Sequence, residues 1–168
     1  DCDWSSRVLF RSAALVMAVT RTIVRDLAQG GRTPAEIMLQ TNERLRDSQR
    51  AGTFVTLFLG RYDIPSGKVT YANGGHLPPF LISPNGNVVS TGEPTGTIVG
   101  MLGGMEYTDA EFTLQPGDTM LLYTDGYPEA RSAAGEFYGI PRIKSFLQKH
   151  AKANCLELCE AAIRDITN

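Results

Sequence analysis

Residues 119–130 offer side chains that could bind a metal ion at the end of a strand. The stretch opens with an uncharged run, residues 119–123, whose β-branched, apolar and aromatic side chains predict a strand buried on both faces. Asp125 falls where this strand should end, and Gly126 would let the backbone turn sharply beside it. A carboxylate held there with its oxygens outward suits a hard cation such as Mg²⁺ or Mn²⁺. The same residues also fit an ordinary Asp-Gly hairpin turn, and the stretch alone leaves both interpretations open.

Three further residues could support chemistry at Asp125. Thr124 precedes it and Glu129 follows four residues later, and both are candidates for orienting the groups around a bound ion. Glu129 is equally explained as a carboxylate at the start of a helix, where the helix dipole favours negative charge. His76 lies in a loop dense in glycine and proline and could be a general acid or a metal ligand. Since no second ligand type stands near His76 in the sequence, a structural role that bonds backbone across the loop is favoured.

The elements that must position these residues follow from hydrophobic periodicity and turn signals. Two helices are predicted first, over residues 12–29 and 33–50, and Thr33 and Glu36 form a capping box at the start of the second. Strands are predicted over residues 54–62, 69–72, 79–83, 87–90, 107–114 and 119–123. A glycine-rich loop covers residues 92–104, and two more helices are predicted over residues 140–150 and 154–166. This order indicates one domain of the α+β class.

Composition narrows the function classes. The chain has 168 residues, 42% of them hydrophobic and 20% charged, with a net charge of −2, which is ordinary for a globular domain. No run of Lys and Arg supports nucleic-acid binding, and no apolar stretch reaches the roughly 18 residues of a membrane span. The three cysteines show no disulfide-framework spacing, which indicates a reducing compartment and hence a cytoplasmic location.

Five collinear motifs carry a resemblance to a known family. They are Phe54-Val55-Thr56, the stretch from Tyr71 to Pro79 that contains Asn73-Gly74-Gly75-His76, the stretch from Leu114 to Asp118, the T-D-G-x-x-E-A motif at residues 124–130, and Gly135 to Gly139 followed by Arg142-Ile143. Together they resemble the PPM-type metal-dependent serine/threonine phosphatases, above all the bacterial SpoIIE/RsbU-type branch, over about residues 13–147. Asn42 also matches a recurrent Asn of that family, although an exposed polar residue would look the same in the sequence.

The resemblance implies a four-layer α/β/β/α sandwich of two antiparallel sheets flanked by helices, and a site for two Mn²⁺ or Mg²⁺ ions. In this family the carboxylate ligands come from a G-D-x-S-G loop, from T-D-G and from a terminal D-D motif. Only the T-D-G ligand, Asp125, has a counterpart here, with the backbone of Gly126 beside it. Because no G-D-x-S-G loop precedes residue 13 and the first glycine is Gly30, we expect residues 1–12 to be a leader foreign to the fold; the alternative is a truly diverged start. Residues 13–168 would be a partial phosphatase domain, incomplete at both ends and inactive by itself.

The resemblance also implies a function for the complete protein. It would be a serine/threonine phosphoprotein phosphatase of bacterial signalling that acts on a phosphorylated STAS-type anti-anti-sigma regulator, with a sensor domain upstream. The alternative is a pseudophosphatase that binds such a phosphoprotein without hydrolysis. Cysteine-phosphatase and serine-hydrolase chemistry lack their signatures, Cys-x5-Arg and G-x-S-x-G. Specificity would come from a protein surface such as residues 92–104 and 131–139.

Overall fold

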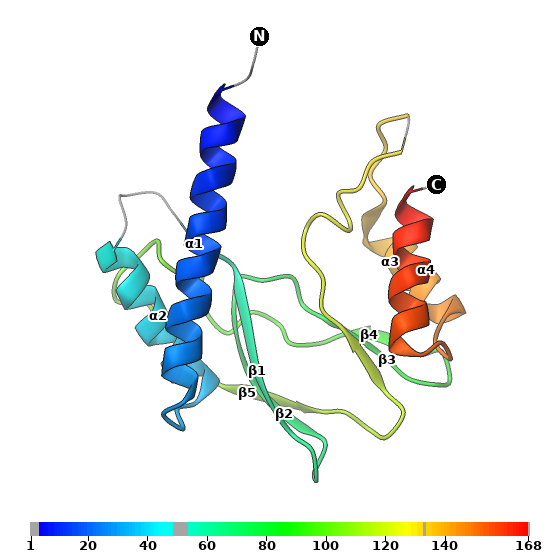
Figure 1. Ribbon diagram of the computed structural model, residues 1–168. Coiled ribbons are helices and arrows are strands. Elements are labelled where there is room, and N and C mark those ends of the chain that lie inside the picture. The colour runs from blue at the N-terminus through cyan, green and yellow to red at the C-terminus, as the bar shows by residue number, and fades with distance from the viewer. Residues whose placement is uncertain (1–3, 49–53, 133, 168) are drawn as a thin grey trace. The chain divides into compact units, whose positions relative to one another are not determined.

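The computed structural model describes residues 4–48, 54–132 and 134–167, with the backbone alone for residues 4–12 and 48. The chain forms two compact units (Figure 1). Unit 1 contains residues 1–61, 70–76 and 94–111, and unit 2 contains residues 62–69, 77–93 and 112–168. The units are considered one at a time below.

Two helices dominate unit 1. Helix α1 (Trp4–Ala28) begins eight residues before the predicted start, so its backbone continues through most of the segment for which the sequence predicts no element. Helix α2 (Pro34–Ser48) begins with the predicted capping box. The Glu36 N–H donates to Thr33 Oγ1 at 3.3 Å, and the Thr33 N–H donates to Glu36 Oε2 at 2.8 Å. This exchange satisfies two backbone donors that a helix start otherwise leaves without partners.

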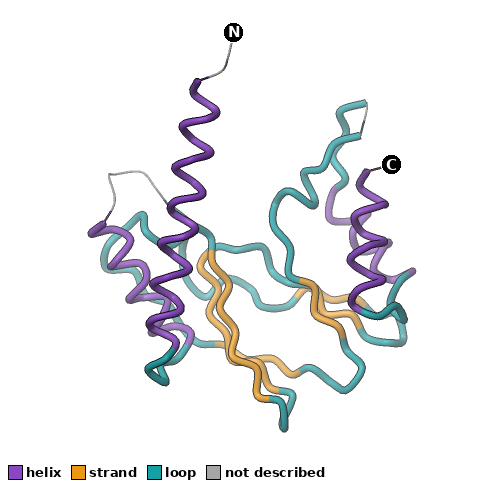
Figure 2. Tube along the Cα trace, viewed as in Figure 1, coloured by secondary structure: helices purple, strands orange, loops and turns teal. Residues whose placement is uncertain are grey.

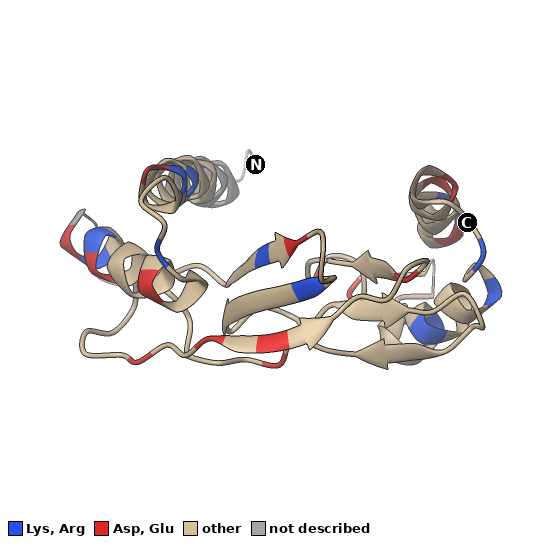
Figure 3. Cartoon of the chain, turned by 90° about the horizontal axis from the view of Figure 1, so that it is seen from below, with Lys and Arg blue, Asp and Glu red and all other residues tan. Residues whose placement is uncertain are grey.

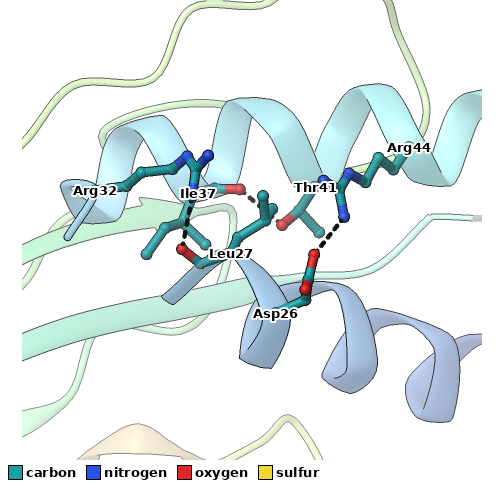
Figure 4. A network of polar contacts seen from close by, with 6 residues as sticks. All are labelled: Asp26, Leu27, Arg32, Ile37, Thr41 and Arg44. Carbon is teal, nitrogen blue, oxygen red and sulfur yellow. Dashed lines mark hydrogen bonds and ion pairs between the residues drawn. The ribbon is translucent and has the colours of Figure 1, made fainter. Parts of the chain in front are cut away.

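Polar contacts join α1 to α2 and close the turn between them (Figure 4). Arg44 of α2 forms an ion pair with Asp26 of α1 at 2.9 Å, and Arg32 donates to the Leu27 carbonyl at 3.2 Å. The Arg44 and Asp26 side chains are 48% and 67% exposed, so the pair contributes at most about 1 kcal/mol. Burial of apolar side chains is therefore the main source of stability in this unit. Its core consists of Val16, Ala35, Met38, Leu45, Val55, Ala72, Val99 and Tyr107.

Asn42 is buried within α2 and fastens the glycine-rich loop to it. Its side chain has no exposed surface. The amide Nδ2 donates to the Leu102 carbonyl at 2.9 Å, and the Gly100 N–H donates to Oδ1 at 2.7 Å. The sequence left the role of Asn42 open, and the structure shows that it is a structural residue with partners about 60 positions away.

The strands form two small sheets (Figure 2). Strands β1 (Leu57–Asp63), β2 (Lys68–Gly74) and β5 (Ala110–Thr113) lie in the order β1-β2-β5. Strands β3 (Phe80–Ile82), β4 (Val88–Ser90) and β6 (Thr119–Leu121) lie in the order β4-β3-β6. β3 pairs antiparallel with both neighbours, with Phe80 opposite Ser90 and Leu121. All six strands fall within or next to the predicted ranges.

The prediction of a strand buried on both faces was wrong for β6. The strand ends at Leu121 instead of Tyr123, and its three residues are half-buried. Leu122 is 46% exposed, and Tyr123 is the first residue of the run that is buried. Among the described strands β6 pairs with β3 alone, so one of its edges has no strand beside it. An uncharged run cannot by itself distinguish an edge strand from a central one.

Aromatic rings form the centre of unit 2. The rings of Phe80 and Tyr123 stack with centroids 5.3 Å apart, and Tyr127 meets Tyr123 edge to face at 6.3 Å. Tyr138 stacks on the other side of Tyr127 at 5.4 Å. Each such pair contributes about 0.5–1.5 kcal/mol beyond the area it buries. The stack therefore joins β3, the segment after β6 and the residue that precedes α3.

The hydroxyl groups of this stack differ in their hydrogen bonds. The Tyr138 hydroxyl donates to the Asp165 carboxylate, and burial together with that carboxylate raises the pKa of Tyr138. The Tyr127 hydroxyl is buried and has no hydrogen-bond partner among the described residues. Burial also raises the pKa of Tyr127, so both phenols stay protonated at neutral pH.

Two helices complete unit 2. Helix α3 (Gly139–Lys149) buries Ile143, Phe146 and Leu147 against the aromatic core. Helix α4 (Cys155–Thr167) starts at a second capping arrangement, in which Asn154 and Glu157 exchange hydrogen bonds of 3.0 and 3.1 Å. No helix among the described residues is long and apolar enough to span a membrane. Acidic and basic residues are interspersed over helices and strands (Figure 3).

Replacing Asn42 with Ala should destabilise the chain. The change leaves the Gly100 N–H and the Leu102 carbonyl without partners, and each buried polar group left unpaired costs about 1–3 kcal/mol. Urea unfolding should show a loss of roughly 2–4 kcal/mol, whereas Glu43→Ala, an exposed change on the same helix, should stay within about 0.5 kcal/mol. Equal effects of the two substitutions would contradict the role assigned to Asn42.

Replacing Tyr127 with Phe should leave stability unchanged or raise it by about 1 kcal/mol, because it removes a buried hydroxyl without a partner and keeps the stacked ring. Tyr127→Ala should cost roughly 2–4 kcal/mol, because the ring itself is lost. The free energy of unfolding in urea checks both values. A marked loss of stability in Tyr127→Phe would mean that the hydroxyl has a stabilising partner.

Candidate functional site

The T-D-G motif lies in a turn that follows β6 in unit 2. The Tyr127 N–H donates to the Thr124 carbonyl at 3.1 Å, and the Glu129 N–H donates to the Asp125 carbonyl at 2.9 Å. Farther along, the Gly139 N–H donates to the Pro128 carbonyl at 2.9 Å. Backbone groups thus close the turn and attach it to the start of α3, so its shape does not depend on the Asp125 side chain.

Tyrosine rings that pack against the core on either side direct the Asp125 side chain outward. Tyr123 and Tyr127 both pack into the aromatic core, whereas Asp125 between them is exposed. The Asp125 carboxylate forms no hydrogen bond or ion pair with any described residue. An exposed carboxylate on a fixed turn, with all its acceptor positions free, is chemically suited to a hard divalent cation.

Gly126 does not play the conformational role that the sequence predicts. Its φ is not among the positive values that favour glycine in this chain. A Cβ added there would meet only Thr124 Oγ1, at an ordinary 3.8 Å. The turn would therefore accept alanine, and the small residue leaves the space beside Asp125 open.

Thr124 and Glu129 are exposed and lie in the same turn as Asp125. The alternative explanation of Glu129 as a helix-start carboxylate is wrong, because the next described helix, α3, begins only at Gly139. The Glu129 carboxylate has no hydrogen bond or ion pair among the described residues. A supporting role for either residue at a bound ion stays a prediction.

His76 lies in unit 1, where a buried asparagine holds its loop. The Asn73 side chain accepts the His76 N–H at 2.8 Å and donates to the His76 carbonyl at 3.0 Å. The His76 ring contacts Thr56, with 3.0 Å between Nδ1 and Oγ1. The bonding to backbone across the loop thus comes from Asn73, whereas the His76 ring bonds a side chain outside the loop, so the proposed structural role of the His76 ring and any role toward Asp125 stay predictions. Sequence reasoning missed Asn73, whose only signal was its place before two glycines.

The described residues offer one candidate ligand for a metal ion. Asp125 supplies an exposed and unpaired carboxylate. No group of three or more His, Cys, Asp or Glu residues that could hold a metal ion occurs in the described parts of the chain. A metal-ligand role for Asp125, with Glu129 in the same turn, stays a prediction.

Comparison with known proteins places this geometry in context. The family model described as Stage II sporulation protein E (SpoIIE) matches residues 11–168. The phosphoserine phosphatase RsbU of Bacillus subtilis (strain 168) is 27% identical over 146 residues, which cover 87% of this chain and 43% of RsbU. The chain therefore spans less than half the length of that relative.

Solved structures share the fold. The SiaA-PP2C domain of Pseudomonas aeruginosa superposes with a TM-score of 0.78 at 24% identity, covering 92% of this chain and 62% of that one. The RsbU and RsbW domains of Rv1364c from Mycobacterium tuberculosis give a TM-score of 0.76 at 28% identity, covering 92% and 43%. RsbX, solved in complex with magnesium, gives 0.60 at 18% identity, covering 90% and 64%.

These likenesses confirm the α+β prediction and the antiparallel sheets of a PP2C-type, that is PPM-type, phosphatase domain. Because the family model matches nearly the whole chain, this chain belongs to the SpoIIE family.

Proposed function

We propose that the protein is a metal-dependent serine/threonine phosphoprotein phosphatase and that Asp125 is one of its metal ligands. The observation that carries this proposal is the exposed, unpaired carboxylate on a turn whose shape is set by its own backbone and by tyrosines packed against the core. Membership of the SpoIIE family and the likeness to a phosphoserine phosphatase support it.

The chain's own residues would position the bound ion and the groups around it. Mn²⁺ or Mg²⁺ ions, when bound, supply the charge that activates water for attack on a phosphomonoester. Asp125 would hold such an ion on a support that does not rearrange, since the turn is already closed. Gly126 would leave room beside the carboxylate for phosphate or water, and Glu129 would accept hydrogen bonds from water near the ion.

The substrate would be a phosphoserine or phosphothreonine on a small regulator with a STAS fold, in a bacterial partner-switching pathway. Two likenesses support this choice: RsbU is a phosphoserine phosphatase, and the Rv1364c structure joins an RsbU domain to an RsbW domain. A site that grips phosphate through ions offers little selectivity for the rest of the substrate. Selectivity would then come from the protein surface around the turn.

Replacing Asp125 with Asn should abolish metal-dependent phosphate release from the full-length protein. The change removes one negative ligand while keeping size and fold, so the free energy of unfolding without metal should stay within about 0.5 kcal/mol. Calorimetric titration with Mn²⁺ should show weakened binding. Glu43→Gln, which neutralises an exposed carboxylate of unit 1, should leave both readouts unchanged. Normal turnover in Asp125→Asn would refute the assignment.

A comparison of two substrates tests the proposed substrate class. With Mn²⁺, the full-length protein should release phosphate from a phosphorylated STAS-type regulator of the same genome with a higher kcat/KM than from a small aryl phosphate. Turnover of the aryl phosphate alone would reject the regulator as substrate and keep the phosphatase. Binding of the regulator without turnover of either substrate would favour the pseudophosphatase.

A further inference from the structure

The loop after the T-D-G turn folds back on itself. The Tyr138 N–H donates to the Ala130 carbonyl at 2.8 Å, and Arg131 and Phe137 form an antiparallel bridge. The Ser132 N–H donates to the Glu136 carbonyl at 2.9 Å. These bonds join the two legs of the loop, residues 130–132 and 136–138, directly between the Asp125 turn and α3.

Two arginines are held at this loop by aromatic rings. The Arg131 guanidinium lies over the Phe137 ring at 4.3 Å, and the Arg142 guanidinium lies over the Tyr138 ring at 4.6 Å. Neither guanidinium forms an ion pair or a hydrogen bond with the described residues. A guanidinium that stacks through its face keeps the N–H donors on its edge available for an oxyanion.

Both arginines line one cavity of about 270 Å³. Ser132, Glu136, Tyr138 and Asp165 also contribute to its lining. The volume is below the roughly 300–1,000 Å³ typical of sites for whole small molecules. The cavity therefore fits a single side chain better than a free metabolite.

The charges around the cavity favour a monoanion. Asp165 accepts the hydrogen bond of the Tyr138 hydroxyl, so its carboxylate is already engaged. The two guanidiniums and the exposed Glu136 carboxylate form no hydrogen bond or ion pair with the described residues. The two guanidiniums carry two positive charges and the Glu136 and Asp165 carboxylates carry two negative ones, so the lining is balanced and accepts the single charge of a carboxylate better than the double charge of a phosphate dianion.

We propose that this cavity binds an acidic side chain, Asp or Glu, of the phosphoprotein substrate. The proposal rests on the phosphatase function proposed above and adds a recognition site that begins five residues after Asp125. Arg131 and Arg142 form the charge-assisted bonds to the carboxylate, and Ser132 can donate a further hydrogen bond. The arginines thereby select substrates without touching the phosphate that reacts.

Two fluorescent phosphoserine peptides of the same length test this assignment, one with glutamates beside the phosphoserine and one with glutamines. Fluorescence anisotropy with the metal-free full-length protein measures binding apart from catalysis. The glutamate peptide should bind more tightly, and Arg131→Gln combined with Arg142→Gln should weaken its binding by about 5- to 20-fold, as expected for partly exposed ion pairs. Lys149→Gln combined with Lys152→Gln, which also removes two positive charges at exposed residues, is the matched control.

A third peptide, the glutamate peptide without phosphate, separates carboxylate from phosphate recognition. Binding of this peptide should still be weakened by the Arg131→Gln and Arg142→Gln changes. If the double variant binds it as tightly as the wild-type protein does, or if the wild-type protein binds the glutamate and glutamine peptides equally, the proposal is overturned. Kinetics with Mn²⁺ add an independent readout: the double variant should raise KM for the glutamate peptide and leave hydrolysis of an aryl phosphate unchanged. If no substrate is turned over, the phosphatase function fails while the binding result still decides the recognition site.

Discussion

The packing of two tyrosines, one buried and one half-buried, on either side of Asp125 is the constraint on which the candidate site depends. Tyr123 and Tyr127 cannot leave the aromatic core without losing stacked rings and buried apolar surface, so the residue between them must face away from it. The backbone of the turn satisfies its own hydrogen bonds, so the Asp125 carboxylate has no structural task to perform. The packing that stabilises the fold thus orients the Asp125 carboxylate, although this carboxylate does not itself stabilise the fold.

In unit 1, buried asparagines fix loops by hydrogen bonds to the backbone. Asn42 and Asn73 have no exposed side-chain surface, and each bonds both a backbone donor and a backbone acceptor of a loop. A buried amide is stable only when its partners are present, so each asparagine selects one loop conformation. In unit 1, therefore, buried polar groups with full partners fix the loops, whereas in unit 2 buried rings fix the turn.

Local patterns could be predicted from the sequence, and contacts between distant residues could not. The capping box of Thr33 and Glu36 is a four-residue pattern, and its two hydrogen bonds are present. The partners of Asn42 lie 58 and 60 residues away, so no local pattern distinguishes it from an exposed amide. The extent of β6 depends on how many strands pair with it, and the role of Gly126 depends on a backbone conformation that glycine permits but does not require.

One aromatic ring connects the two parts of unit 2 to which chemistry and recognition are assigned. Tyr138 stacks on Tyr127 of the Asp125 turn, carries the Arg142 guanidinium on its ring and donates its hydroxyl to Asp165. A side chain bound in the cavity would therefore contact groups that pack directly against the turn. Since both regions share this framework, an acidic anchor on the substrate would be held in a fixed relation to Asp125. Binding energy gained at the anchor would then help to orient the phosphoserine, which is the way that remote contacts raise the rate of a reaction.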